Sequence, residues 1–313
     1  MAGARPKPDS CSSGCRSARD LYPEWLVGNP YLGSGVEDVL LAREADTAAY
    51  SGRLGEARDF SRRAVASAER AAEKEKAASY EVDAALREAL FGNAAAGRQR
   101  AAAALGLSIG RDVRYGAALA LAMAGDAARA QALAEDLAKR FPEDTLVQFN
   151  YLPTLHAQLA LGRNNASKAI EALQAAAPYE LGDPTEAFTF LSLYPVYVRA
   201  EAYLAGHHET GAAAAEFQKI LDHGGVVFNE PIGALAHLGL ARASALAGDN
   251  VKSRMVYQDF LTLWKDADPT SPILKQAKTE YALHGGRYEN LPCNRPPPVW
   301  SSHFHSYPVE DKE

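Results

Sequence analysis

Apolar positions between Ala42 and Ala282 recur at helical spacing, and no run alternates polar with apolar residues as a half-buried strand would. Alanine dominates this stretch, joined by Leu, Glu, Arg and Lys, which are all strong helix formers. The apolar-periodic segments end repeatedly at a glycine, followed by polar residues and a second such segment. This pattern predicts an all-α protein built from helical hairpins.

Six glycines mark the predicted turns, because a helix that ends in a left-handed residue carries a Cβ penalty that glycine avoids. They are Gly52, Gly92, Gly125, Gly162, Gly206 and Gly248, and successive members lie 40, 33, 37, 44 and 42 residues apart. The spacing is close to the period of about 34 residues in tetratricopeptide repeats, with short extensions in several loops. We therefore expect about six hairpins stacked into a right-handed, tetratricopeptide-like α-solenoid.

The third unit matches a tetratricopeptide repeat most clearly. Ala130 follows Gly125 by five residues and Pro142 follows it by 17, as the small packing residue and the terminal proline of such a unit do. Small residues at a crossing let two helices approach closely. Ala130 is therefore predicted at the crossing of the two helices of this hairpin.

The two ends differ from the middle of the chain. Residues 1–35 and 285–313 are rich in proline and are predicted to be disordered or loosely attached, which leaves 36–284 as the repeat domain. Residues 271–284 are predicted to form a final helix, with Lys275, Lys278 and Glu280 as the polar outer face of a cap.

Charge narrows the range of partners. The formal net charge of −6 arises from 39 acidic and 33 basic side chains mixed along the helices, so no phosphate-binding face and no nucleic acid partner are expected. The sequence contains no run of about 18 or more apolar residues, which is the length that a membrane-spanning helix needs. The N-terminus also lacks the apolar core of a secretory signal. A cytoplasmic location is the default expectation.

From about residue 36 to 284 the chain resembles the tetratricopeptide region that lies C-terminal to the kinase domain in a group of bacterial serine/threonine protein kinases. The segments that carry the resemblance are Ala48-Ala49-Tyr50-Ser51-Gly52-Arg53-Leu54, Phe141-Pro142-Glu143-Asp144-Thr145, Gln148-Phe149-Asn150-Tyr151-Leu152-Pro153, Asn229-Glu230-Pro231-Ile232-Gly233-Ala234 and Tyr257-Gln258-Asp259-Phe260-Leu261. The resemblance implies a sensor or regulatory arm, which would be extracytoplasmic where the repeats follow a membrane span.

Catalytic signatures do not support an enzyme. The resemblance does not extend to kinase activity, because no histidine is followed by Arg-Asp and neither Asp-Phe pair continues with glycine. Gly106-Leu107-Ser108-Ile109-Gly110 matches the G-x-S-x-G elbow of serine hydrolases, with Ser108 as the nucleophile. That elbow requires a preceding strand, whereas an alanine-rich helical run precedes Ser108, so an inter-repeat turn is favoured.

The three cysteines lie near the ends of the chain, outside the predicted helices. Cys293 with His303 and His305, joined by Cys11 or Cys15, offers suitable ligand types, but the spacing fits no zinc module well. Incidental residues in an unstructured tail are favoured, and no metal or cofactor is expected.

The leading hypothesis is a scaffold in which the first helix of each hairpin lines a groove that holds a protein or peptide partner. Self-association is a second kind of partner. Counting back from the turn glycines, the groove-facing residues are Tyr115, Phe149, His156 and Arg242. The alternative for Tyr115 and Phe149 is that they pack between hairpins. The alternative for His156 and Arg242 is that they are simply exposed to solvent. The alternatives are a hydrolase that uses Ser108 and a truncated remnant without function.

Overall fold

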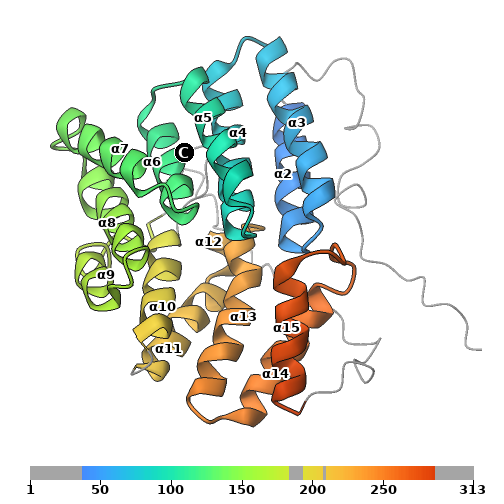
Figure 1. Cartoon of the computed structure of the whole chain (residues 1–313). Helices are drawn as coiled ribbons and strands as arrows, with labels where there is room; N and C mark the ends of the chain where they lie inside the picture. Colours follow the sequence, from blue (N-terminus) through green and yellow to red (C-terminus); the bar gives the residue numbers. More distant parts are fainter. Residues whose placement is uncertain (1–36, 183–192, 207–208, 286–313) are drawn as a thin grey trace, which may run out of the picture.

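The computed structural model describes residues 37–182, 193–206 and 209–285, and these form an all-helical protein (Figure 1). Within the described ranges there are fourteen α-helices, one π-helical turn and no strand. The helices are α2 (Glu37–Tyr50), α3 (Leu54–Arg70), α4 (Lys74–Leu90), α5 (Ala94–Leu107), α6 (Arg111–Met123), α7 (Ala127–Arg140), the π-helical η1 (Val147–Tyr151), α8 (Leu152–Leu161), α9 (Ala166–Leu173), α10 (Tyr194–Gly206), α11 (Thr210–Asp222), α12 (Gly224–Val227), α13 (Pro231–Leu246), α14 (Asn250–Leu263) and α15 (Pro272–Leu283). The predicted all-α class is confirmed.

Most of the predicted turn glycines join the two helices of a hairpin. Gly52, Gly92, Gly125 and Gly248 adopt left-handed φ angles of 76°, 82°, 78° and 80°. The turn between α8 and α9 differs, because Gly162 is helical with φ −61° and Asn164 takes the left-handed conformation with φ 57°. Asparagine tolerates this conformation better than most residues. Gly206 is the last residue of α10.

The first and second helices of the hairpins differ in how deeply they are buried. The first helices contact one another in the order α4, α6, α8, α10 and α13, while α5, α7, α9 and α11 each pack against the first helix that follows. On α6 every residue from Tyr115 to Ala122 is buried, whereas on α7 only Ala130, Ala134 and Leu137 are. The first helices are therefore the core of the molecule, and the second helices cover it with one apolar face.

The hairpin array returns on itself. In Figure 1 the chain runs leftward from α2 and α3 along the top to α7, α8 and α9, and back along the bottom to α14 and α15, which lie below α2 and α3. Helix α2 contacts α13. In an open solenoid each repeat contacts only its neighbours, so a contact between the first and the last hairpin is an additional feature of this chain.

A tryptophan near the end of the array makes much of this contact. Trp264, which has no exposed surface, donates a hydrogen bond of 3.0 Å from Nε1 to the carbonyl oxygen of Tyr50. Its ring stacks on Phe91 with 5.4 Å between the ring centres. The backbone N–H of Asp268 donates to the carbonyl oxygen of Gly52 at 3.1 Å, and Asp268 Oδ2 accepts a bond of 2.8 Å from the N–H of Gly55. We call these contacts the closure.

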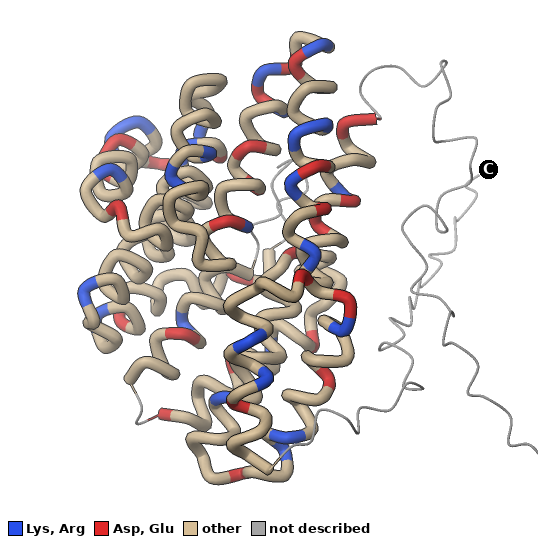
Figure 2. Tube along the Cα trace, turned by 45° about the vertical axis from the view of Figure 1, so that its right-hand side comes forward, with Lys and Arg blue, Asp and Glu red and all other residues tan. Residues whose placement is uncertain are grey.

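The final helix forms as predicted, but its polar face is placed differently. Glu280 on α15 does not belong to an outer face, since its carboxylate accepts hydrogen bonds of 3.0 Å from both Arg242 Nε and the Tyr257 hydroxyl. The predicted leader and all but Gly285 of the predicted tail lie outside the described residues. Charges of both signs are mixed over the described part of the chain, as expected from the sequence (Figure 2).

The third hairpin allows a test of the predicted helix crossing. Ala130 has no exposed surface, whereas Ala128 is exposed on the same helix, α7. Added volume in a packed site typically costs about 1–3 kcal/mol, so Ala130→Leu is expected to lower the free energy of unfolding by that amount. Ala128→Leu is expected to change it by less than about 0.5 kcal/mol. Urea unfolding of both variants measures the difference, and equal midpoints would contradict the packing.

Candidate functional site

The structure separates the four predicted groove residues. Tyr115 has no exposed surface and stacks on Tyr151, with ring centres 3.7 Å apart and an interplanar angle of 4°. Tyr115 therefore packs between hairpins and cannot contact a partner in this conformation. Arg242 is partly buried on α13, and its guanidinium pairs with Glu280 of α15 at 3.0 Å. This ion pair joins α15 to α13. Arg242 therefore has a structural role that does not require contact with a partner.

Phe149 and His156 are placed differently, on the surface of the fourth hairpin. In the stretch 147–160, which covers η1 and most of α8, they are the two residues classed as exposed. Phe149 is 42 % exposed and stacks on Tyr179, which is also 42 % exposed, at a centroid distance of 5.1 Å. Phe149 lies within η1, and π-helical turns of this kind frequently occur at functional positions.

Two exposed apolar residues follow α9, and one of them, Tyr179, stacks on Phe149. Tyr179 and Leu181 are both exposed, and Glu180 between them is buried. The Glu180 carboxylate forms an ion pair of 2.8 Å with Arg199 on α10 and a second one with Lys219 on α11. Because Glu180 is anchored, its two neighbours are held outward. We call Phe149, Tyr179 and Leu181 the aromatic patch.

His156 brings no positive charge to this side of the hairpin near neutral pH. Partial burial, together with the nearby charge of Lys168, lowers the pKa of His156 below its ordinary value of 6.5. The imidazole is therefore neutral at pH 7 and offers one donor and one acceptor.

A second group of side chains lies inside the molecule, where the first hairpins meet α13. Arg87 on α4 pairs with Asp46 on α2 at 2.5 Å and donates a bond of 2.9 Å to the Ser61 hydroxyl. Both charged residues are buried. Glu230, also buried, accepts a hydrogen bond of 3.3 Å from the Tyr194 hydroxyl. Asp83 Oδ1 is buried without a hydrogen-bond partner.

Burial has a strong effect on these acids. Loss of hydration raises the pKa of Asp83 to about 7, and the neighbouring charge of Asp46 adds to this shift, while Arg87 and Arg43 oppose it. The same causes raise the pKa of Glu230 well above its ordinary value. We call Asp46, Asp83 and Glu230 the interior acids.

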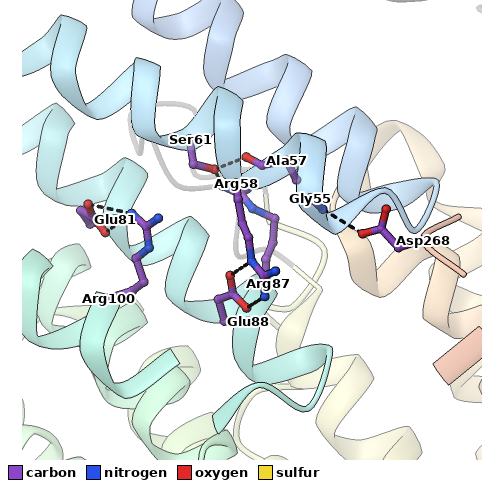
Figure 3. A network of polar contacts seen from close by, with 9 residues as sticks. All are labelled: Gly55, Ala57, Arg58, Ser61, Glu81, Arg87, Glu88, Arg100 and Asp268. Carbon is purple, nitrogen blue, oxygen red and sulfur yellow. Dashed lines mark hydrogen bonds and ion pairs between the residues drawn. The ribbon is translucent and has the colours of Figure 1, made fainter. Parts of the chain in front are cut away.

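Ion pairs also join the first hairpins to one another. In Figure 3, Arg58 on α3 reaches Glu88 on α4 with hydrogen bonds of 2.6 and 2.7 Å, and Arg100 on α5 reaches Glu81 on α4 at 3.0 Å. The same view shows Asp268 facing the N–H of Gly55. Helix α4 is buried along most of its length because α3, α5 and α6 all pack against it.

Ser108 lies in a turn, as its helical context predicts. It follows α5 with an extended backbone, φ −144° and ψ 151°, and precedes α6. Its hydroxyl accepts a bond of 2.9 Å from the N–H of Gly110 and donates to the carboxylate of Glu75. A helix stands where a nucleophile elbow requires a strand, and the group bonded to Ser108 is a carboxylate instead of an imidazole.

The described residues hold neither a cluster of metal ligands nor a membrane-spanning helix. Within 37–182, 193–206 and 209–285, no group of three or more His, Cys, Asp or Glu side chains is arranged to hold a metal ion. The tail residues Cys11, Cys15, Cys293, His303 and His305 lie outside these ranges. None of the described helices combines the length and the apolar character needed to cross a bilayer.

Comparison of the chain with protein-family models, with curated proteins and with solved structures finds no match.

Proposed function

We propose that the chain is a non-catalytic, tetratricopeptide-like scaffold that binds a protein or peptide partner, and that the aromatic patch is where the partner docks. The exposed and anchored stack of Phe149 on Tyr179 carries this proposal. Aromatic side chains that are already ordered lose little entropy on binding, and they are the residues that most often dominate interface energies.

The side chains of the aromatic patch define the kind of partner that it fits. Phe149, Tyr179 and Leu181 offer apolar and aromatic surface, and His156 on the same hairpin is neutral at pH 7. An apolar anchor side chain in an extended or helical segment would bury the patch. The buried first helices do not offer a continuous groove in this conformation, so docking is assigned to the outer surface of the fourth hairpin.

The resemblance to the repeat region of bacterial serine/threonine kinases supplies a biological setting for the proposal. In that setting the chain would act as a sensor or regulatory arm through its bound partner, or by self-association. The hairpins at the predicted turn glycines and the all-helical fold support a repeat protein of this kind.

A selected peptide tests the patch directly. Peptides enriched from a phage-displayed random library on the intact chain would be titrated against Phe149→Ala and against Ile109→Ala, a matched truncation of an exposed apolar residue in another turn. Loss of a hot-spot side chain costs about 2 kcal/mol or more, so Phe149→Ala should weaken binding about 30-fold and Ile109→Ala by less than about twofold. Failure to enrich any peptide, or equal affinities for both variants, would contradict the proposal.

A further inference from the structure

The second helix of the last hairpin, α14, exposes large apolar side chains at a position where other second helices do not. Val251 and Met255 lie three and seven residues after the left-handed turn residue Gly248, and they are 62 % and 53 % exposed. The equivalent residues of four other hairpins are also exposed but are small or polar: Gly55 and Asp59 on α3, Ala95 and Gln99 on α5, Ala128 and Ala132 on α7, and Ser167 and Glu171 on α9. Among these five helices, α14 alone presents an apolar pair there.

Arg254 belongs to the same face of α14. Residues three and four apart are neighbours on a helix surface, so Val251, Arg254 and Met255 form one stripe. Arg254 and the neighbouring Lys252 are both exposed, which places two positive charges beside the apolar pair. We call Val251, Arg254 and Met255 the terminal face.

The described part of the chain ends beside the terminal face. The ring of His284 stacks on that of Tyr257 on α14, with 6.0 Å between the ring centres. Gly285 follows with φ 80°, and a methyl group built on it would lie 3.7 Å from Arg254 Nη1. Residues 286–313 therefore continue from a point at the edge of this face.

These continuing residues include a group that can reach the face and match its apolar character. Val299, Trp300 and Phe304 are apolar or aromatic, and Val299 lies 14 residues after Gly285. An extended chain of that length spans up to about 45 Å. Helix α14 has 14 residues and is about 21 Å long, so every position on it is within reach.

Charge and area favour the chain's own segment over a second copy. Glu310 and Asp311 follow the aromatic group and are opposite in charge to Lys252 and Arg254. A stable interface between separate proteins buries roughly 800 Å² on each partner, far more than two apolar side chains offer. A tethered segment needs much less, because its effective concentration is on the order of millimolar.

We propose that the terminal face is the docking site of residues 299–304 of the same chain, with Trp300 and Phe304 covering Val251 and Met255. The contact ties the segment after α15 to the outside of the last hairpin. It leaves the aromatic patch on the fourth hairpin free, so the inference does not depend on the partner proposed above.

Oxidation of Met255 reports whether the face is covered. The chain has three methionines, Met1, Met123 and Met255, and the partly buried Met123 on α6 is the internal reference. Hydrogen peroxide converts an accessible methionine to its sulfoxide, and mass spectrometry of peptides gives the rate at each site. A contact formed for about four fifths of the time slows oxidation about fivefold. Full-length Trp300→Ala with Phe304→Ala should therefore oxidise at Met255 about fivefold faster than the natural chain, with Met123 unchanged.

Matched variants assign the effect to the two surfaces. Ser301→Ala with Ser302→Ala should leave the rate at Met255 within about twofold of the natural chain. Val251→Ser should raise that rate and add little to the aromatic variant, because both remove one contact, whereas Ala128→Ser at the equivalent position of α7 should not raise it. Equal rates at Met255 in the natural chain and the aromatic variant would overturn the proposal. Protection that grows with protein concentration would overturn it as well, by identifying a second copy as the occupant.

Discussion

Replacing Arg87 with methionine is expected to lower the free energy of unfolding by about 3–5 kcal/mol, because it removes the closer of the two cations that pair with the buried Asp46 carboxylate. Arg87 and Asp46 are both buried, and their ion pair joins α4 to α2. Burial already raises the pKa of Asp46 although Arg87 and Arg43 oppose the shift. Removal of the guanidinium deletes the larger of these opposing charges.

Two controls give this prediction its specificity. Arg62→Met removes an exposed partner of Asp59 on α3 and should cost less than about 1 kcal/mol, since both side chains are in water. Arg87→Met combined with Asp46→Asn should be more stable than Arg87→Met alone, because the second change removes the stranded charge. Urea unfolding near pH 7 compares all variants. An Arg87→Met variant as stable as Arg62→Met would show that the pair does not carry the expected energy.

Local sequence signals account for the parts of the fold that could be predicted. A left-handed turn residue leaves a trace in the sequence, so Gly52, Gly92, Gly125 and Gly248 locate four hairpin turns. Ala72 takes the same conformation between α3 and α4 with φ 62°, and an alanine gives no such signal. The sequence thus reveals turns where the residue type reports the backbone conformation, and it conceals them where the surrounding structure imposes that conformation.

Contacts between distant residues account for what could not be predicted. Trp264 and Tyr50 are separated by 214 residues, and neither has a local pattern that points to the other. Asp83 and Arg87 do leave a local signal, since they lie four residues apart on one face of a helix that is otherwise rich in alanine.

In the candidate site, too, some residues could be predicted from local sequence and others depend on distant contacts. Counting back from a turn glycine placed Phe149 and His156 on the first helix of the fourth hairpin, and both are exposed there. The same count selected Tyr115, but stacking on Tyr151 buries it completely. Position along a helix fixes which face a residue occupies, whereas the neighbouring hairpin decides whether that face meets solvent. Tyr179 and Leu181 were missed because their exposure depends on the ion pairs of Glu180 with α10 and α11.

Gly52→Ala is expected to destabilise the protein by about 2–5 kcal/mol, because two separate costs add at this position. The left-handed φ of 76° imposes about 1–2 kcal/mol on any residue with a Cβ atom. The new methyl group would also lie 2.6 Å from the Ala267 side chain and 2.7 Å from the Trp264 ring. Such close contacts force the closure apart or distort it, and overpacking of this kind adds about 1–3 kcal/mol.

Gly92→Ala and Gly125→Ala separate these two costs. Both glycines have left-handed φ angles of 82° and 78°, and a methyl group on either would meet nothing within 4 Å. They should therefore lose only the backbone contribution of about 1–2 kcal/mol. Unfolding free energies from urea titration give the difference between Gly52→Ala and these variants, which measures the packing of Trp264 against the first turn. If all three variants lose the same free energy, the first and last hairpins are not in close contact in solution, and the closed arrangement would have to be abandoned.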